Sequence, residues 1–241
     1  MDRLIYLSMS AAKATMQRQE VLAHNLANVS TTGFRAELAA FRAVPVRGDG
    51  ASTRVYTLES TIGYNPQPGS VQATGRNLDV AMAGNGWLAV QALDGTEAYT
   101  RAGAIEINAE GVLVNTAGLP VLGDGGPINV PPNAAIDIAA DGTVSARQGD
   151  GKPQPVGRLK LVTPEGPLER STDGLFRAPQ GDLAADPAAR LQSGALEGSN
   201  VSAIETMVAM ISAARQFEHQ MKMLQNAEQK EQAAAKLLTQ Q

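Results

Sequence analysis

The 241-residue chain contains no cysteine, which excludes disulfide bonds, thiolate nucleophiles and cysteine-based zinc sites together. It has only two histidines, His24 and His219, and neither has a second histidine or a carboxylate at a convincing ligand spacing. Glu218 precedes His219, but adjacent residues of a helix point in different directions. We therefore expect no metal site and interpret both histidines as structural or interfacial.

The chain also lacks any concentration of charge of one sign. Its 20 basic and 24 acidic residues leave a net charge of -4, and the basic residues are scattered. A surface that follows a phosphate backbone needs clustered basic residues. We expect no nucleic acid among the partners.

Long hydrophobic runs are absent too, since no stretch approaches the roughly 18 apolar residues of a membrane span. The start imitates a signal peptide, with Arg3, an apolar run and an A-x-A sequence at Ala12–Ala14. However, Asp2 offsets the arginine, serines interrupt the run, and helical spacing continues to Leu26. We expect no lipid-embedded segment and no cleaved signal.

Two short motifs of enzymes occur without their required context. Gly84–Ala89 spells G-x-G-x-x-A, but the following Trp87–Gln91 has the pattern of a strand, and phosphate binding needs a helix there. Ser10–Lys13 spells S-x-x-K, but S-D-N and K-T-G are missing. The acidic glycine turns do not repeat as calcium-binding arrays do. We expect no cofactor and no catalytic residues.

The C-terminal segment Ser202–Leu238 has the pattern of one long helix. Ser202 and Glu205 form a capping box, and neither Gly nor Pro interrupts the segment. About 37 residues give a helix of about 55 Å. Its apolar residues recur at steps of three and four: Ile204, Met207, Ile211, Ala214, Phe217, Met221, Leu224 and Ala227.

A second, shorter helix is predicted at the N-terminus, ending around Asn25–Gly33. One apolar stripe comprises Ile5, Met9, Ala12, Met16, Ala23 and Leu26, and another comprises Leu4, Leu7, Ala11, Ala14, Val21 and Leu22. A short helix with two stripes cannot cover all apolar surface of the longer one, because a helix of about 25 residues spans only about 37 Å. Periodicity alone leaves two interpretations open: a helical hairpin beside a globular domain, or a subunit that polymerises through its paired ends.

The middle of the chain has the signals of β structure. A hairpin containing a strand at Arg54–Leu58 is expected in the connector after the first helix. Asp-Gly turns then separate short apolar runs, which is a strong hairpin signal. The expected strands are Leu78–Met82, Trp87–Gln91, Ala98–Arg101, Ile105–Asn108, Val112–Asn115, Ile136–Ala139, Thr143–Ala146 and Arg158–Val162.

These patterns predict an α+β protein, with a discontinuous, coiled-coil-like helical domain from both termini and an all-β middle domain. We place the N-terminal helix in residues 1–34 and the connector with its β-hairpin in 35–76. The all-β domain takes 77–180, a return linker 181–199, and the C-terminal helix 200–241.

Several stretches carry a resemblance to a known family. Ala23–Arg35 resembles the N-terminal signature of bacterial flagellar rod and hook proteins. Leu196–Val201, with Met210-Ile211 and Arg215–Glu218, is similar to their C-terminal signature. The motifs Thr74–Ala81, Gly84–Trp87 and Tyr99–Gly103 resemble the core motifs of the same family.

The opening Met1–Tyr6, Trp87 and Arg158–Val162 are most similar to the proximal rod branch of this family. A distal rod or hook-type axial subunit is the alternative. Two positions depart from the family pattern: His24 stands where Asn is usual, and His219-Gln220 stand where Ala-Asn often follows the Phe-Glu pair.

The resemblance implies a non-enzymatic structural subunit of the flagellar basal-body rod, which assembles through its terminal helices into the drive shaft across the periplasm. It implies as partners the chain itself, other proximal and distal rod proteins, and the flagellar export apparatus, with export that needs no cleaved signal. A competing hypothesis is a secreted β-domain enzyme that acts on the cell wall through carboxylates such as Asp79, Asp94 or Asp141.

The assembly interface expected from the stripes and signatures comprises Leu4, Ile5, Met9, Met16, Leu22, Asn25, Leu26, Ala27, Asn28, Thr31, Thr32, Gly33, Phe34, Leu196, Glu197, Ser199, Asn200, Val201, Ile204, Met207, Met210, Ile211, Arg215, Phe217, Glu218, Met221 and Leu224.

Overall fold

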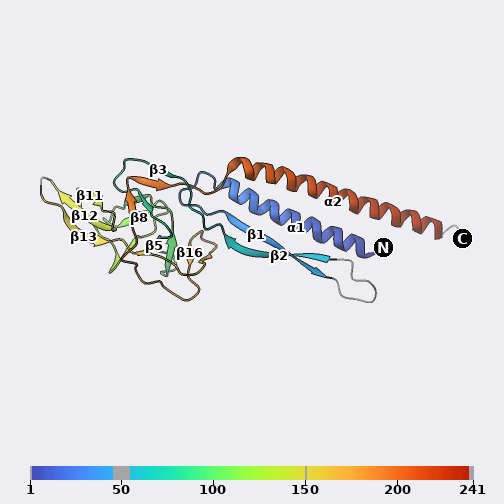
Figure 1. The fold of residues 1–241 in the computed structure, drawn as a ribbon, viewed down its shortest axis with the longest axis horizontal. Coiled ribbons are helices and arrows are strands. Elements are labelled where there is room, and N and C mark those ends of the chain that lie inside the picture. The colour runs from blue at the N-terminus through green and yellow to red at the C-terminus, as the bar shows by residue number, and fades with distance from the viewer. Residues whose placement is uncertain (1, 46–54, 150, 239–241) are drawn as a thin grey trace. The chain divides into compact units, whose positions relative to one another are not determined.

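A computed structural model describes residues 2–45, 55–149 and 151–238 of the chain (Figure 1). It divides into two units. Unit 1 comprises Met1–Val29, Glu37–Ile62 and Val201–Gln241, and unit 2 comprises Ser30–Ala36 and Gly63–Asn200. Long helices at both ends and a strand-rich middle confirm the predicted α+β class.

Unit 1 contains α1 (Asp2–Ala27) and α2 (Ala203–Leu238), which lie side by side and run antiparallel (Figure 1). The amide of Glu205 donates to the Ser202 hydroxyl at 3.4 Å, so the predicted N-cap is present. Neither helix has a run apolar enough to span a membrane, as far as its residues are described.

The predicted hairpin of the connector is confirmed as a two-stranded sheet of β1 (Glu37–Pro45) and β2 (Val55–Tyr64). The first residue of the predicted strand, Arg54, lies outside the described residues. Since β1 packs beside α1, the hairpin covers part of the shorter helix.

The most buried side chains of the paired helices are small or polar. Ser8, Ala12 and Thr15 are buried on α1, and Thr206, Ala213 and Ala227 are buried among the described side chains of α2. The Thr15 hydroxyl lies 3.1 Å from Oε1 of Gln220, a contact between the two helices. Such small residues let the two backbones approach closely.

The prediction of a single apolar stripe on α2 was wrong, because its members lie on two faces. Ala227 is buried, and Ala214, Phe217 and Leu224 are partly buried. The larger side chains of the stripe remain exposed: Ile204, Met207, Ile211 and Met221. On α1, Met9 and Met16 are likewise exposed although Ala12 of the same predicted stripe is buried.

Unit 2 is built from short strands, and every strand predicted in it overlaps an observed one. They are β3 (Val71–Ala73), β4 (Val80–Met82), β5 (Trp87–Gln91), β6 (Glu97–Thr100), β7 (Ile105–Ile107), β8 (Leu113–Asn115), β9 (Leu122–Gly123), β10 (Gly126–Pro127), β11 (Ala134–Ile138), β12 (Thr143–Gln148), β13 (Gln154–Arg158), β14 (Leu161–Val162), β15 (Glu169–Arg170), β16 (Phe176–Arg177), β17 (Leu191–Ser193) and β18 (Ala195–Glu197). The largest sheet has the order β14-β5-β6-β16-β15, and β11-β12-β13 form a second.

Strand β5 separates two hydrophobic clusters. Successive side chains of a strand point to opposite faces of the sheet. Leu88 and Val90 therefore enter the main core, whereas Trp87 and Ala89 enter a smaller cluster with Tyr99. Burial on both faces explains why this strand is a continuous apolar run in the sequence.

Shortening Leu88 tests this core. Leu88 is fully buried, so Leu88→Ala should lower the free energy of unfolding by about 2–5 kcal/mol through lost contacts and a cavity. Leu93 is 96% exposed, and Leu93→Ala should stay within about 0.5 kcal/mol of the parent. Urea unfolding followed by fluorescence of the single tryptophan, Trp87, measures both. Equal effects of the two changes would show that β5 is misplaced.

Candidate functional site

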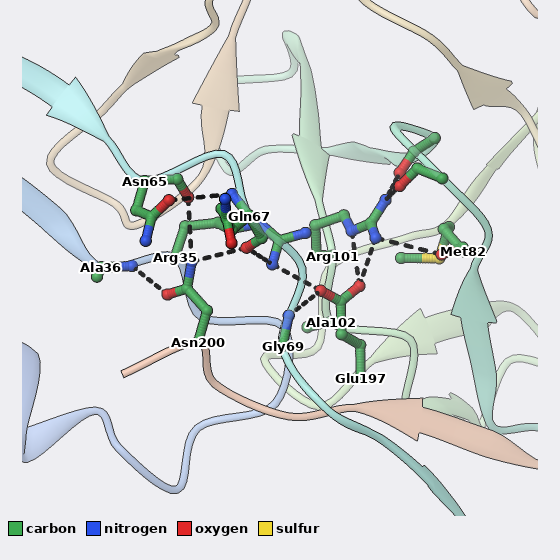
Figure 2. Close-up of polar contacts among 12 residues, drawn as sticks. Arg35, Ala36, Asn65, Gln67, Gly69, Met82, Arg101, Ala102, Glu197 and Asn200 are labelled. Carbon is green, nitrogen blue, oxygen red and sulfur yellow. Dashed lines mark hydrogen bonds and ion pairs between the residues drawn. The ribbon is translucent and has the colours of Figure 1, made fainter. Parts of the chain in front are cut away.

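A buried cluster of three charges lies where the two terminal signatures meet in unit 2 (Figure 2). Glu197 ends β18, and its side chain is 1% exposed. Nη1 of Arg35 lies 2.6 Å from Glu197 Oε1, and Nη2 of Arg101 lies 2.5 Å from Oε2. Both arginine side chains are 2% exposed, so one carboxylate is shared by two buried guanidinium groups.

Arg101 is also held by backbone carbonyls at the end of β4. It donates to the carbonyls of Gly84 at 3.1 Å and Met82 at 3.2 Å, and to that of Gly86. Burial lowers the pKa of Arg101, and the charge of Glu197 opposes this shift. Because an arginine remains protonated throughout, the carboxylate is what balances the buried charge.

The N-terminal signature reaches this cluster through Gly33. Its amide donates to the carbonyl of Glu197 at 2.7 Å, and its φ of 68° favours glycine. A Cβ at this position would lie 2.3 Å from the backbone of Arg101. Only glycine fits so close to another backbone, which explains this residue of the signature.

Asn25 links the end of α1 to the start of β1 by two hydrogen bonds within unit 1. Its amide nitrogen donates to the Glu37 carbonyl at 3.0 Å, and its oxygen accepts from the Glu37 amide at 2.8 Å. Nδ1 of His24 lies 3.1 Å from Glu37 Oε2. The search for a partner of His24 by sequence spacing missed Glu37, because this residue lies on β1, 13 residues further along the chain.

Several residues of the expected interface are buried inside the chain. Asn25, Gly33, Phe34 and Glu197 have intramolecular contacts, so in this structure they hold the fold of one chain. Partly buried members are Ile5, Leu22, Leu26, Asn28, Thr32, Leu196, Ser199, Asn200, Val201, Met210, Phe217 and Leu224. The side chain of Leu4 lies outside what the structure describes.

The remaining expected interface residues are exposed: Met9, Met16, Ala27, Thr31, Ile204, Met207, Ile211, Arg215, Glu218 and Met221. On α2 they lie beside a shallow groove of about 380 Å³ lined by Val208, Ile211, Ser212, Arg215, Gln216 and His219. We call the exposed apolar residues Tyr6, Met9 and Met16 of α1 and Ile204, Met207, Val208 and Ile211 of α2 the outer face.

The carboxylates of the enzyme hypothesis each have a structural partner. Asp79 accepts from Thr74 at 2.7 Å, and Thr96 and Thr143 donate to the turn residues Asp94 and Asp141. Hydrogen bonds from the hydroxyl and amide of Thr96 hold the pKa of Asp94 below its ordinary range, and those from the amide and hydroxyl of Thr143 do the same for the pKa of Asp141. Over residues 2–45, 55–149 and 151–238, no three His, Asp or Glu side chains gather as a metal site.

Comparison with known proteins matches the two ends and the middle of the chain to three family models. The flagella basal body rod protein family matches residues 5–35, the flagellar hook protein FlgE/F/G D1 domain matches 81–146, and the flagellar basal body rod FlgEFG protein C-terminal family matches 192–237. Over 250 residues the chain is 50% identical to the flagellar basal-body rod protein FlgF of Salmonella typhimurium, with 99% of both chains covered. This chain belongs to the FlgF branch of the flagellar basal-body rod protein family.

Other relatives agree with this placement and confirm the resemblance inferred from sequence. FlgF of Escherichia coli is 49% identical over 251 residues, again covering 99% of both chains. The flagellar basal-body rod protein FlgG of Bacillus subtilis is 35% identical over 179 residues, which cover 68% of this chain and 67% of that protein. The distal rod alternative therefore fits less well.

The three family regions meet in the charge cluster. Arg35 is the last residue of the first matched region, Arg101 lies in the second, and Glu197 lies in the third. The cluster thus joins the two terminal signatures to the central domain of a rod-family chain.

Removing the negative charge of Glu197 should lower the free energy of unfolding of unit 2. Glu197→Gln leaves two buried guanidinium groups without a counter-charge, and we expect a loss of about 3–5 kcal/mol in the free energy of unfolding. The control is Glu165→Gln at an exposed position, with an expected change within about 0.5 kcal/mol. Urea unfolding of unit 2, followed by Trp87 fluorescence, gives the answer. If both variants are as stable as the parent, the cluster does not hold the fold.

Proposed function

We propose that this chain is a non-enzymatic structural subunit of the proximal flagellar basal-body rod, and that it assembles through the outer face of α1 and α2. Family membership supports the rod assignment, and the FlgF relatives match nearly the whole chain. The proposed location is the basal body within the periplasm. The proposed partners are further copies and other rod proteins, and the flagellar export apparatus delivers the chain without a cleaved signal.

The observation that carries the assembly role is the distribution of side chains on the helix pair. Small residues such as Ala12 and Ala213 fill the contact between α1 and α2, whereas Ile204, Met207 and Ile211 face outwards. Burying a large apolar side chain contributes about 1.5–3 kcal/mol. The exposed apolar side chains keep this free energy available for contact with neighbours, whereas Phe217 and Leu224 are already partly buried in the single chain.

This arrangement also suits a shaft that transmits torque. Helices packed side by side through apolar faces form interiors as dense as organic crystals, with low compressibility. A shaft of many such pairs resists twisting because each helix is held by its neighbours. The buried charge cluster then fixes both terminal signatures to the central domain of each subunit.

A charge on the outer face should block assembly without unfolding the chain. Ile211 is 55% exposed in the single chain, so Ile211→Asp should change the stability of the monomer little. In an assembled rod the same carboxylate would replace an apolar side chain at a buried contact, and the loss of its hydration would cost several kcal/mol. We expect loss of incorporation into purified basal bodies and loss of swimming when the variant replaces the parent.

The matched control is Asn226→Asp, which adds the same charge at an exposed polar position of α2. It should incorporate normally. Phe217→Asp should also block incorporation, but by weakening the pairing of α1 with α2, because Phe217 is partly buried in the single chain. Normal rods and swimming with Ile211→Asp would contradict the proposed interface.

A further inference from the structure

We propose that unit 2 contains a binding groove for the extended segment Gly33–Ala36, and that the groove accepts this segment as a separate peptide, as it would from a second copy of the chain. The groove is formed by Asn65–Gly69, Arg101, Arg170 and Glu197–Asn200. This inference does not depend on the assembly role.

The segment supplies no strand of unit 2 and no member of its hydrophobic clusters. Residues 30–36 belong to no helix or strand of the described chain. The hydrophobic clusters on both sides of β5 likewise draw their members from residue 64 onwards. The sheets and the core can therefore form without the segment, which is the condition for a preformed site.

The groove makes at least one hydrogen bond to the backbone of each residue of the segment. Glu197 accepts from the amide of Gly33, and the Asn200 amide donates to the carbonyl of Phe34 at 3.2 Å. Arg170 donates to the carbonyl of Arg35 at 3.1 Å. The amide of Ala36 donates to Oδ1 of Asn200 at 2.7 Å, and its carbonyl accepts from the Asn65 amide at 2.8 Å. Proteins that bind extended peptides obtain affinity from this kind of backbone pairing.

The Arg35 side chain supplies specificity (Figure 2). It donates to the Gln67 carbonyl at 2.8 Å and pairs with Glu197 Oε1. The groove orients that carboxylate on its own, because the Gly69 amide donates to Oε1 at 2.9 Å and Arg101 holds Oε2. The Arg35 guanidinium thus pairs with the Glu197 carboxylate, whose position is already fixed by Gly69 and Arg101.

Gly33 and Phe34 add two further requirements on the sequence of the bound peptide. The groove wall approaches Gly33 so closely that an added Cβ would lie 2.4 Å from the Ala102 amide nitrogen. The Phe34 ring is 5% exposed and lies beneath the guanidinium of Arg170, 4.5 Å from its carbon to the ring centroid. The preferred ligand is therefore an extended peptide that contains the sequence Gly-Phe-Arg.

The test uses the full chain with its own segment weakened by the double substitution Phe34→Ala and Arg35→Gln. A synthetic peptide of residues 28–38 is added, and the folded fraction is followed by Trp87 fluorescence and by thermal unfolding. We expect saturable binding that raises the unfolding midpoint. A peptide carrying Arg35→Gln should bind at least about tenfold more weakly, because a charge-assisted pair is lost, and one carrying Gly33→Ala should not bind.

The unmodified chain is the second control. Its own tethered segment acts at an effective concentration in the millimolar range, so the peptide should bind it far more weakly than it binds the double variant. If the double variant is unfolded without peptide, refolding by the parent peptide and not by the Gly33→Ala peptide supports the groove. The proposal is overturned if no peptide binds or refolds the variant, or if all three peptides act equally.

Discussion

The structure of this chain depends on one carboxylate shared by two buried guanidinium groups. Glu197 brings together Arg35 from the N-terminal signature and Arg101 from the central domain, and all three side chains are nearly inaccessible to water. Buried charges are tolerated only when they are paired and hydrogen-bonded. The cluster therefore requires Arg35, Arg101 and Glu197 to be in place together within unit 2, and each of the three family regions contributes one of them.

The helix pair is packed differently from a globular core, because it leaves several large apolar side chains exposed. The buried side chains of the two helices include the small residues Ala12 and Ala213, and the Thr15–Gln220 contact adds a polar pair between the helices. A polar pair between helices fixes register at some cost in stability. The larger apolar residues of the outer face remain exposed in the single chain, which is why we propose that the same two helices also pack against neighbouring chains.

The sequence was sufficient for the elements whose signals are local. The helix of residues 203–238 and the strand Trp87–Gln91 follow from periodicity and turn residues, and the observed bounds agree closely. The seam between the helices was mispredicted because the apolar pattern was traced through large residues, whereas Ala213 and Thr206 form the contact. The charge cluster could not be predicted, since Arg101 and Glu197 are 96 residues apart and no local pattern pairs them. The signature residues were expected at an interface between subunits, but several of them, such as Asn25 and Gly33, contact their own chain in this structure.

Hydrogen exchange of the dilute, full-length chain measures whether the helices depend on assembly for their stability. We expect the amides of α1 and α2 to exchange far faster than those of β5 in the solitary chain, and to become protected once the chain is assembled in the rod. Helix amides as protected as those of β5 in the dilute chain, with no change on assembly, would contradict this expectation.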